Sequence, residues 1–372
     1  MLLVGGGHSH IEVVRRFGLT PPAGIDLTLV SREATAPYSG MLPGHVAGLY
    51  PLDAIGIDLA ALCRMAAARG AAVRFEAAAV ERIDPDAKTV RTADGRTLAY
   101  DILSLNLGST PSRPGAVGLA VKPIPDFLVA LEALRERVAA ASRPLRLAVV
   151  GAGPAGVELA LGLQHRLAKM PAGDGAAVQI TLVAASPELL PGRSARTRRL
   201  IDATLRRRGI DVELSFEVAA FRDGALVDAD GHSLLADEVV WATNATAPKW
   251  LRETGLALDE HGFVRVDATL RSLSHPSVFA AGDVASPPGR VSKAGVFAVR
   301  QGPVLAHNLR RAATGGRLRR YRPQRHWLAL ISTADGRAVA DKFGLSVSGR
   351  WVWHWKDWSD RRFVRRYGAG RP

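Results

Sequence analysis

The stretch VVGAGPAGVELA, residues 149–160, decides the fold. It continues an apolar run at residues 145–150 and spaces Gly151, Gly153 and Gly156 as strand-to-helix turns that bind a dinucleotide do. A pyrophosphate needs a tight turn, a backbone without side chains and a helix N-terminus aimed at its charge. We therefore predict a nucleotide site here, with contacts from Gly151, Gly153, Pro154 and Gly156.

A second glycine cluster, VGGGHSHIEVVRR, occupies residues 4–16. Gly5 and Gly7 take the first two glycine positions, whereas His10 stands at the third. The third glycine normally allows helix and strand to pack closely, so the phosphate contact should survive its replacement. The candidate contacts are Gly5, Gly7, His8, Ser9 and His10. No other His, Cys, Asp or Glu clusters nearby, so we expect no metal site.

The chain repeats one α/β plan twice. In each half a glycine turn and helix precede a second strand, a hairpin turn and an apolar strand. These elements are expected at residues 25–30, 93–95 and 102–107 in the first half, and at 179–183, 229–231 and 239–243 in the second. A helix at 130–141 should end at Ser142-Arg-Pro144, before the second glycine strand.

The residue that ends the second strand of such a unit usually selects the cofactor, because a carboxylate there binds the ribose 2′-hydroxyl and repels a 2′-phosphate. Neither half has one: the first offers Ser31 and Arg32, and the second offers Ala184. The choice between NADH and NADPH therefore stays open.

Composition narrows the function classes. With 372 residues and 47% hydrophobic content the chain is expected to form two or three domains. Cys63 is the only cysteine, which excludes an internal disulfide, a thiol relay and a zinc cluster, and it is expected to be a small core residue. Redox chemistry must therefore use a bound cofactor. We expect a cytoplasmic protein, because the sequence shows neither a signal-peptide pattern nor an apolar run of membrane-spanning length.

The net charge of +14 is concentrated near the C-terminus, where residues 305–372 hold 16 Lys or Arg against 4 Asp. A solvated basic face, an anionic lipid surface at the inner face of the membrane and an acidic protein partner all fit this charge, and nucleic acid fits less well. Trp351, Trp353 and Trp355 alternate as on a strand, so we expect hairpin strands followed by a short basic helix. A lid or a dimer surface is a further alternative.

A third element, Ser277-Val-Phe-Ala-Ala-Gly-Asp283, resembles the late flavin signature of the pyridine nucleotide-disulfide reductase superfamily, the flavoproteins with two dinucleotide-binding domains. The resemblance implies that Gly282 and Asp283 bind FAD, that the first turn holds this FAD, and that the second holds NADH or NADPH. It further implies contacts from Gly108, Ala294 and, at the domain crossing, Asn244.

Pro37 to Gly48 is similar to the loop that type II NADH dehydrogenases place beside the flavin ring, which implies contacts from Ser39, Gly40, Met41, Leu42 and Pro43. Closer still, the segments 5–10, 38–44, 293–302 and Trp355-Lys-Asp-Trp358 together resemble the flavoprotein domain fused ahead of selenide, water dikinase.

The resemblance implies two three-layer, Rossmann-like dinucleotide-binding domains of the α/β class, with the NAD(P) domain inserted into the FAD domain and a small α+β cap. The expected boundaries are 1–118 and 244–318 for the FAD domain, 119–243 for the NAD(P)H domain and 319–372 for the basic, Trp-rich cap.

Three residues are candidates for catalysis. Glu158 corresponds to an acid that relatives place near the nicotinamide, although it also fits an ordinary helix surface. Lys293 begins a helix expected over 293–313 with Ser292 as its cap, and either adds positive charge beside the flavin or lies on the surface. Gln301 matches the later of two glutamines at the acceptor site of quinone-using relatives, whereas Val296 replaces the earlier one.

The resulting expectation is an NADH dehydrogenase-like oxidoreductase that passes hydride from NAD(P)H to FAD and electrons onward. The acceptor is either a quinone or a small selenium- or sulfur-linked compound. The alternative is a non-enzymatic, redox-sensing flavoprotein that docks to a partner, which the missing ribose carboxylates keep open.

Overall fold

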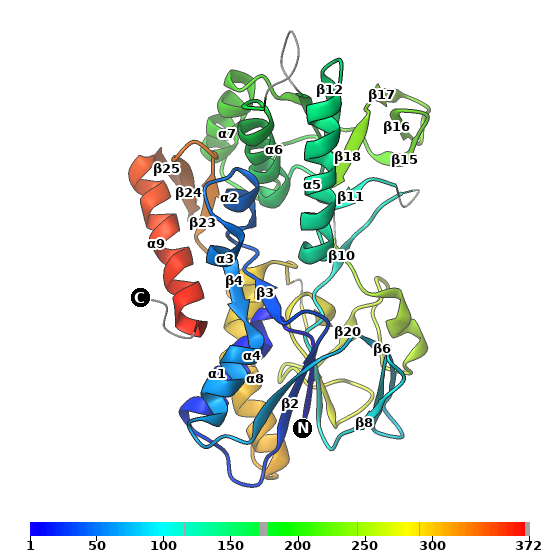
Figure 1. The fold of residues 1–372 in the computed structure, drawn as a ribbon, viewed down its shortest axis with the longest axis vertical. Helices are drawn as coiled ribbons and strands as arrows, with labels where there is room; N and C mark the ends of the chain where they lie inside the picture. Colours follow the sequence, from blue (N-terminus) through cyan, green and yellow to red (C-terminus); the bar gives the residue numbers. More distant parts are fainter. Residues whose placement is uncertain (115–116, 171–177, 244, 290, 369–372) are drawn as a thin grey trace.

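Two parallel β-sheets form the centres of the protein (Figure 1). The computed structural model describes residues 1–114, 117–170, 178–243, 245–289 and 291–368. The first sheet has the order β21-β9-β1-β2-β5, with every neighbouring pair parallel. Its strands are β1 (Leu2–Val4), β2 (Leu27–Ser31), β5 (Val73–Ala77), β9 (Leu103–Leu105) and β21 (Val278–Ala280).

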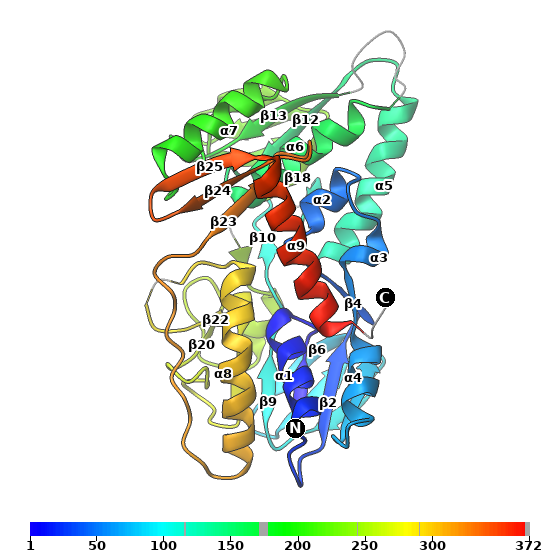
Figure 2. The same ribbon diagram turned by 90° about the vertical axis from the view of Figure 1, so that its left-hand side faces the viewer.

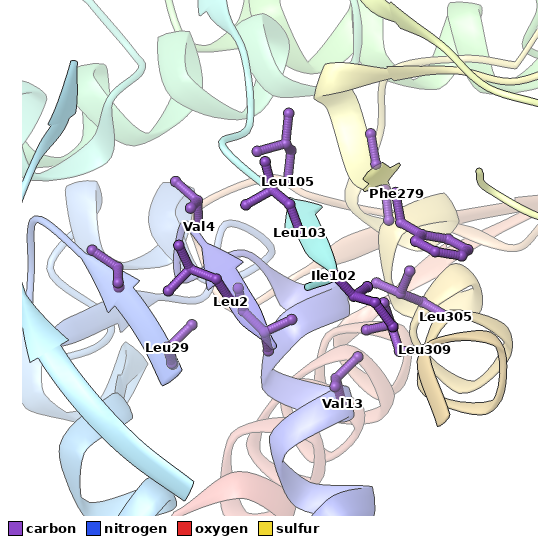
Figure 3. Close-up of a cluster of buried hydrophobic side chains, with 14 of the residues drawn as sticks. Leu2, Val4, Val13, Leu29, Ile102, Leu103, Leu105, Phe279, Leu305 and Leu309 are labelled. Carbon is purple, nitrogen blue, oxygen red and sulfur yellow. The ribbon is translucent and has the colours of Figure 1, made fainter. Parts of the chain in front are cut away.

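Apolar side chains join this sheet to its helices, which are α1 (His8–Leu19), α4 (Leu59–Ala67) and α8 (Gly295–Ala313). Figure 3 shows Phe279 of β21 and Ile102, the residue before β9, near Leu305 and Leu309 of α8, and the side chains of Phe279, Leu305 and Leu309 are fully buried. Central parallel strands are buried on both faces, which explains their uninterrupted apolar runs.

The second sheet repeats the plan with the order β11-β18-β12-β13-β14. Its strands are β11 (Leu119–Ala120), β12 (Leu145–Val150), β13 (Val178–Val183), β14 (Asp211–Glu213) and β18 (Glu238–Trp241), and its helices are α5 (Ile124–Ala140), α6 (Pro154–Leu167) and α7 (Ala195–Arg207). β21 follows this unit in the sequence but pairs with β9 of the first sheet. The second unit is therefore inserted into the first, and the predicted α/β class is confirmed.

Each unit carries a three-stranded antiparallel sheet. These sheets are β6 (Val80–Asp84), β7 (Thr89–Thr92) and β8 (Thr97–Ala99), and β15 (Val218–Arg222), β16 (Ala225–Asp228) and β17 (Ser233–Leu235). Both hairpin turns predicted from the Ala-Asp-Gly triplets lie where expected. Short pairs join β3 (Thr35–Pro37) to β4 (Gly56–Asp58), β10 (Thr110–Pro111) to β19 (Ala245–Thr246), and β20 (Val264–Arg265) to β22 (Ala285–Ser286).

Short helices complete the connections: α2 (Leu42–Val46), α3 (Leu52–Ile55) and the 3₁₀ turns η1 (Lys249–Glu253) and η2 (Gly282–Val284). Two predicted boundaries need correction. α5 begins at Ile124, six residues before the expected start at 130, because Pro125 is accommodated in the first turn of the helix, where a missing amide breaks no hydrogen bond. α8 begins at Gly295 with Ala294 as its N-cap, so Ser292 does not cap it; the carbonyl of Ser292 instead accepts from the Ala294 amide at 3.0 Å.

The prediction for the C-terminal region was wrong in one respect. The hairpin strands lie earlier, as β23 (Ala329–Ser332), β24 (Ala338–Lys342) and β25 (Leu345–Gly349), and all three tryptophans lie on one long helix, α9 (Arg350–Tyr367). The buried face of α9 carries Lys356 and Asp360 besides Val352 and Tyr367, while Trp351, Trp355 and Trp358 are exposed. With polar residues inside and aromatic residues outside, an apolar periodicity cannot reveal the helix.

α9 bridges the two units. In Figure 2 this red helix starts beside β23, β24 and β25 next to the second unit and runs down to the N-terminal end of α1 in the first. α9 therefore passes over the region between the two glycine turns.

Candidate functional site

Asn106 organises the first glycine turn. It follows β9, and its Oδ1 accepts hydrogen bonds from the amides of Ser9 (3.0 Å) and His10 (3.3 Å). Its Nδ2 donates to the Ala281 carbonyl at 2.6 Å. The side chain therefore ties the start of α1 to the segment before Asp283. Sequence reasoning missed this residue, although its place at the C-terminal end of a buried parallel strand is where ligand-binding groups gather.

Gly5 and Gly7 have no room for a side chain. Gly5 has φ +97°, and a Cβ there would lie 2.5 Å from the Asn106 carbonyl oxygen. A Cβ at Gly7 would collide with the Asn106 side chain. Within the described residues, no hydrogen bond engages the amides of Gly6, Gly7 or His8. These amides at the start of α1 form the donor set that a pyrophosphate requires, so the turn fits FAD.

His10 explains the missing third glycine. It is fully buried, with Nδ1 2.7 Å from the Gly5 carbonyl and Nε2 2.8 Å from Ser104 Oγ. Burial lowers its pKa to about 4, so the ring is neutral at pH 7. The imidazole thus holds the glycine turn against β9. In other dinucleotide-binding turns, the third glycine allows this close packing of helix and strand.

Ser9 and His8 face different surroundings. The Ser9 hydroxyl donates to the Ala298 carbonyl of α8 at 2.7 Å, so its side chain joins two helices. The His8 ring makes edge contacts with Tyr38 at 5.4 Å and with Phe363 of α9 at 5.7 Å between ring centroids. Burial lowers the pKa of His8 to about 4, against the opposing effect of Asp283.

The signature residue Asp283 lies in η2 within a charged cluster. Lys122 Nζ donates to its Oδ2 at 2.6 Å and Ser109 Oγ at 3.0 Å. Burial alone would raise the pKa of Asp283, but Lys122 and Ser109 hold it below its ordinary value. Asp283 is therefore a carboxylate, which suits hydrogen bonds to the hydroxyls of a ribitol chain. Lys122 was not among the predicted site residues.

Gln301, predicted as catalytic, supports this turn. Its Oε1 accepts from the Gly282 amide at 2.5 Å, and the side chain is buried. Through this contact Gln301 holds Gly282 in place, and with it the neighbouring Asp283. Lys293 is similarly engaged, because its ammonium donates to the Ala285 carbonyl at 2.6 Å and lies 3.7 Å from the centroid of the Phe263 ring. Burial lowers the pKa of Lys293 to about 8.

The loop at residues 38–43 is fixed by α9. Lys356 Nζ donates to the Gly40 carbonyl at 2.8 Å and to Asp360 Oδ2 at 2.6 Å, and Asp360 also hydrogen-bonds with Tyr38. Burial alone would lower the pKa of Lys356, but the carboxyls of Glu158 and Asp360 raise it above its ordinary value. Lys356 lies within the Trp355-Lys-Asp-Trp358 motif, from which no role for its side chain could be predicted.

Glu158 joins the same cluster from α6. Its Oε1 accepts from the Ser332 amide of β23 at 2.8 Å. Burial raises its pKa to about 7, although Lys356 acts in the opposite direction. A carboxyl that is half-protonated near neutral pH is able to hold or release a proton, so Glu158 is not an ordinary surface glutamate.

The remaining candidates in the loop at residues 38–43 anchor this loop in the hydrophobic interior. Met41, Leu42 and Pro43 are buried, and a Cβ at Gly162 of α6 would lie 3.0 Å from the Pro43 carbonyl oxygen. The loop thus rests on the helix that begins at the second glycine turn. Ser39 Oγ would lie 3.4 Å from a Cβ at Gly295, next to the predicted contact Ala294.

The second glycine turn connects β12 to α6. Gly151 has φ +118°, and a Cβ there or at Gly156 would collide with neighbouring backbone. A Cβ at Gly153 would meet no described atom within 4 Å, which leaves its backbone open to a ligand. Pro154 occupies the first turn of α6, where its missing amide costs nothing. This geometry fits a dinucleotide pyrophosphate. Gly108 is comparably open, with φ +72°.

Neither β2 nor β13 ends in a carboxylate: Ser31 is the last residue of β2, and Ala184 follows β13. The Ala184 amide donates to the Glu213 carbonyl at 2.8 Å. The Arg32 guanidinium pairs with Asp126 at 2.5 Å and Glu33 at 2.9 Å. Asn244 lies outside the described residues.

Other groups lie outside the site. Cys63 is buried in α4, where burial raises its pKa to about 12. The side-chain ligand atoms of Asp228, Asp230 and His232 lie within 4.8 Å of one another, but the Asp228 carboxylate already accepts from the amides of Asp230 and His232 and contacts the His232 ring at 2.8 Å.

Comparison with known proteins agrees with this geometry. The model of the family "Pyridine nucleotide-disulphide oxidoreductase" matches residues 1–312. An NADH dehydrogenase-like protein of Mycobacterium tuberculosis is 32% identical over 224 residues, which cover 58% of this chain and 56% of that protein. This match therefore spans little more than half of the relative's length.

Two further proteins are similar over more of the chain. The type II NADH:quinone oxidoreductase of Haemophilus influenzae is 25% identical over 331 residues, 77% of this chain and 73% of that protein. The sulfide:quinone oxidoreductase of Aquifex aeolicus superposes with a TM-score of 0.80 at 20% identity, over 99% of this chain and 91% of that one, which supports the fold. The predicted superfamily is confirmed: the chain belongs to the pyridine nucleotide-disulphide oxidoreductase family, whose members use FAD and NAD(P)H.

Proposed function

We propose that the protein is an FAD-dependent NAD(P)H oxidoreductase in which the first glycine turn holds FAD and the second holds NADH or NADPH. One observation carries the proposal: α6 begins at the second glycine turn and packs directly against α2 and the loop at residues 38–43. A nicotinamide extending from the second turn would thus meet a flavin ring beside this loop, as hydride transfer requires.

We assign a quinone, or another small two-electron acceptor, as the second substrate. FAD, when bound, accepts hydride from the nicotinamide and supplies two electrons to the acceptor. For a quinone Q the balance is NAD(P)H + H⁺ + Q → NAD(P)⁺ + QH₂, so one proton must come from solvent or a side chain. Glu158 is suited to deliver it because its pKa is raised to about 7 by burial.

The names of similar proteins support a quinone. Besides the Haemophilus protein, a demethylphylloquinone reductase of Synechocystis is 29% identical over 297 residues. A selenium- or sulfur-linked acceptor rests only on the predicted resemblance to the domain fused to selenide, water dikinase. The domain boundaries at 118/119, 243/244 and 318/319 stay predictions.

A cytoplasmic location, with attachment of the basic region to the inner face of a membrane or to an acidic protein, is likewise a proposal. Within the described ranges no helix has the length and apolar content needed to cross a bilayer. The exposed Trp351, Trp355 and Trp358 on α9 are the side chains such an attachment would use.

The direct test is steady-state oxidation of NADH and NADPH by the purified FAD-loaded protein with menadione as acceptor. The proposal expects menadione-dependent oxidation of at least one nucleotide, abolished in a Gly153→Asp variant that places a carboxylate against the pyrophosphate. Absence of turnover with both nucleotides, in protein that retains FAD, would favour the docking-module alternative.

A further inference from the structure

An arginine-rich groove lies between α1 and the C-terminal half of α9. It has a volume of about 650 Å³. Arg15 of α1 and three arginines of α9, Arg362, Arg365 and Arg366, line it, and Tyr38 and Phe363 contribute two aromatic rings. We refer to these six residues as the arginine groove.

The positive charge of the arginine groove is largely uncompensated. Among the described residues, Glu12 is the carboxylate that pairs with arginines of the groove, at 3.5 Å from Arg15 and 3.8 Å from Arg366. The same carboxylate also pairs with Arg16 at 2.6 Å and accepts from the Tyr367 hydroxyl at 2.9 Å.

Arg362 and Arg365 have no carboxylate within ion-pair distance in the part of the chain that the structure describes. Arg362 instead lies over the Trp358 ring, with 5.1 Å to its centroid. Two guanidinium groups that line one hollow without a carboxylate partner favour an anionic occupant.

The aromatic rings give the groove a flat wall. Tyr38 and Phe363 stack with centroids 4.4 Å apart and an angle of 26° between their planes, and the His8 ring meets both edge-on. Such a wall suits a planar ring better than an acyl chain, because stacking is directional.

Tyr38 links the groove to the proposed reaction centre. It stands two residues before Gly40 in the loop that we place beside the flavin, and it hydrogen-bonds with Asp360 of the cluster that holds this loop. His8 starts α1 at the first glycine turn. A ligand in the groove would therefore be separated from the FAD site by a single layer of aromatic side chains.

We propose that the arginine groove binds the electron acceptor, and that this acceptor is a small planar anion, such as a quinone with a carboxylate or sulfonate group. The inference rests on the proposed oxidoreductase function and narrows its substrate class. The quinone ring is reduced by the two electrons and one proton from NAD(P)H plus one further proton, and the anionic group is unchanged.

The kinetic test compares two acceptors with a common core, 1,4-naphthoquinone-2-sulfonate and the neutral menadione. In a double variant Arg362→Glu/Arg365→Glu, kcat/KM for the sulfonate should fall about tenfold or more relative to menadione. The ratio between acceptors cancels general damage to the enzyme. Arg69→Glu, which changes an exposed arginine in the turn after α4, is the matched control and should leave the ratio unchanged.

A second readout measures binding without turnover. Titration calorimetry of the FAD-loaded protein with naphthalene-2-sulfonate should give a dissociation constant that rises about tenfold in the double variant. Arg362→Gln/Arg365→Gln should give an intermediate effect, since it removes charge without reversing it. Circular dichroism melting of each variant verifies that the fold is retained.

Anionic lipid is the competing source of negative charge, so co-sedimentation with vesicles of phosphatidylcholine and phosphatidylglycerol is measured in parallel. Selective loss of sulfonate binding and turnover supports the proposal. Three results would overturn the proposal: an equal loss of kcat/KM with both acceptors, unchanged binding of naphthalene-2-sulfonate, or a loss of vesicle binding alone. If wild type reduces neither acceptor, the proposed function fails, while calorimetry still decides whether the groove binds the anion.

Discussion

Lys356 donates a hydrogen bond to the carbonyl of Gly40, a residue 316 positions earlier in the chain. The contact joins the C-terminal helix to the loop that we place beside the flavin. Because Lys356 is also paired with the buried Asp360, one ammonium group fixes both the loop and the helix that covers it.

Replacing Lys356 by Met should destabilise the protein and loosen FAD. The change leaves the Asp360 carboxylate buried without its cation, which typically costs about 3–5 kcal/mol. Thermal melting and the fraction of FAD retained after gel filtration measure the two effects. Arg361→Met, which breaks the more exposed pair with Asp357, is the control and should do much less. Equal losses in both variants would contradict a special role for Lys356.

Glu158→Gln should remove the transition near pH 7 that we expect in the pH–rate profile of wild type. Burial raises the pKa of Glu158 from 4.5 to about 7, so acceptor reduction by wild type should change with an apparent pKa near 7. Gln retains an oxygen for the Ser332 amide but cannot titrate. A variant profile that keeps the same step at an undiminished rate would exclude Glu158 as the proton carrier.

The same raised pKa predicts the pH dependence of stability. A carboxyl with a higher pKa in the folded than in the unfolded protein favours folding at low pH, and this contribution is lost as pH rises from 4.5 to about 7. The free energy of unfolding of wild type, relative to Glu158→Gln, should therefore decrease across this window in urea titrations. A rising difference would show that the carboxylate, not the acid, is the stabilised form.

His10→Ala should cost about 2–4 kcal/mol, because it opens a buried cavity and leaves the Gly5 carbonyl and Ser104 hydroxyl without their partner. The pKa of His10 is lowered from 6.5 to about 4, so the stabilisation by neutral His10 is complete above pH 6.5 and is lost as pH falls toward 4. Urea titrations at several pH values test both statements, with the exposed His261→Ala as control. If His10→Ala is as stable as wild type, His10 does not hold the glycine turn against β9.

Ala184→Glu should make the second site prefer NADH. A carboxylate at the end of β13 would bind the ribose 2′-hydroxyl and repel a 2′-phosphate, which should lower kcat/KM for NADPH relative to NADH by roughly tenfold or more. The neutral variant Ala184→Gln controls for size. An unchanged ratio between the two nucleotides would mean that Ala184 is not at the ribose.

Local motifs were the features that the sequence predicted best. The turns at Gly5 and Gly151 were recognisable because a phosphate-binding backbone needs glycine at fixed spacings. The sequence pattern did not predict that α9 is one helix over Arg350–Tyr367, because its buried face carries Lys356 and Asp360 and its exposed face carries tryptophans.

Contacts between distant parts of the chain were also beyond the sequence. Asn106 acts through three hydrogen bonds to residues at least 96 positions away, and Lys122 reaches Asp283 across 161 positions. Gln301 and Lys293 were found by resemblance, but only the structure identifies the backbone groups that they bind. Such pairings depend on how the sheets assemble, which no local pattern encodes.

The most direct test of the account is the visible spectrum of the FAD-loaded protein when NADH or NADPH is added without oxygen, followed by menadione. The account predicts that at least one nucleotide bleaches the flavin band and that menadione restores it. A bound flavin that neither nucleotide bleaches would contradict the assignment of the second glycine turn as the site of the electron donor.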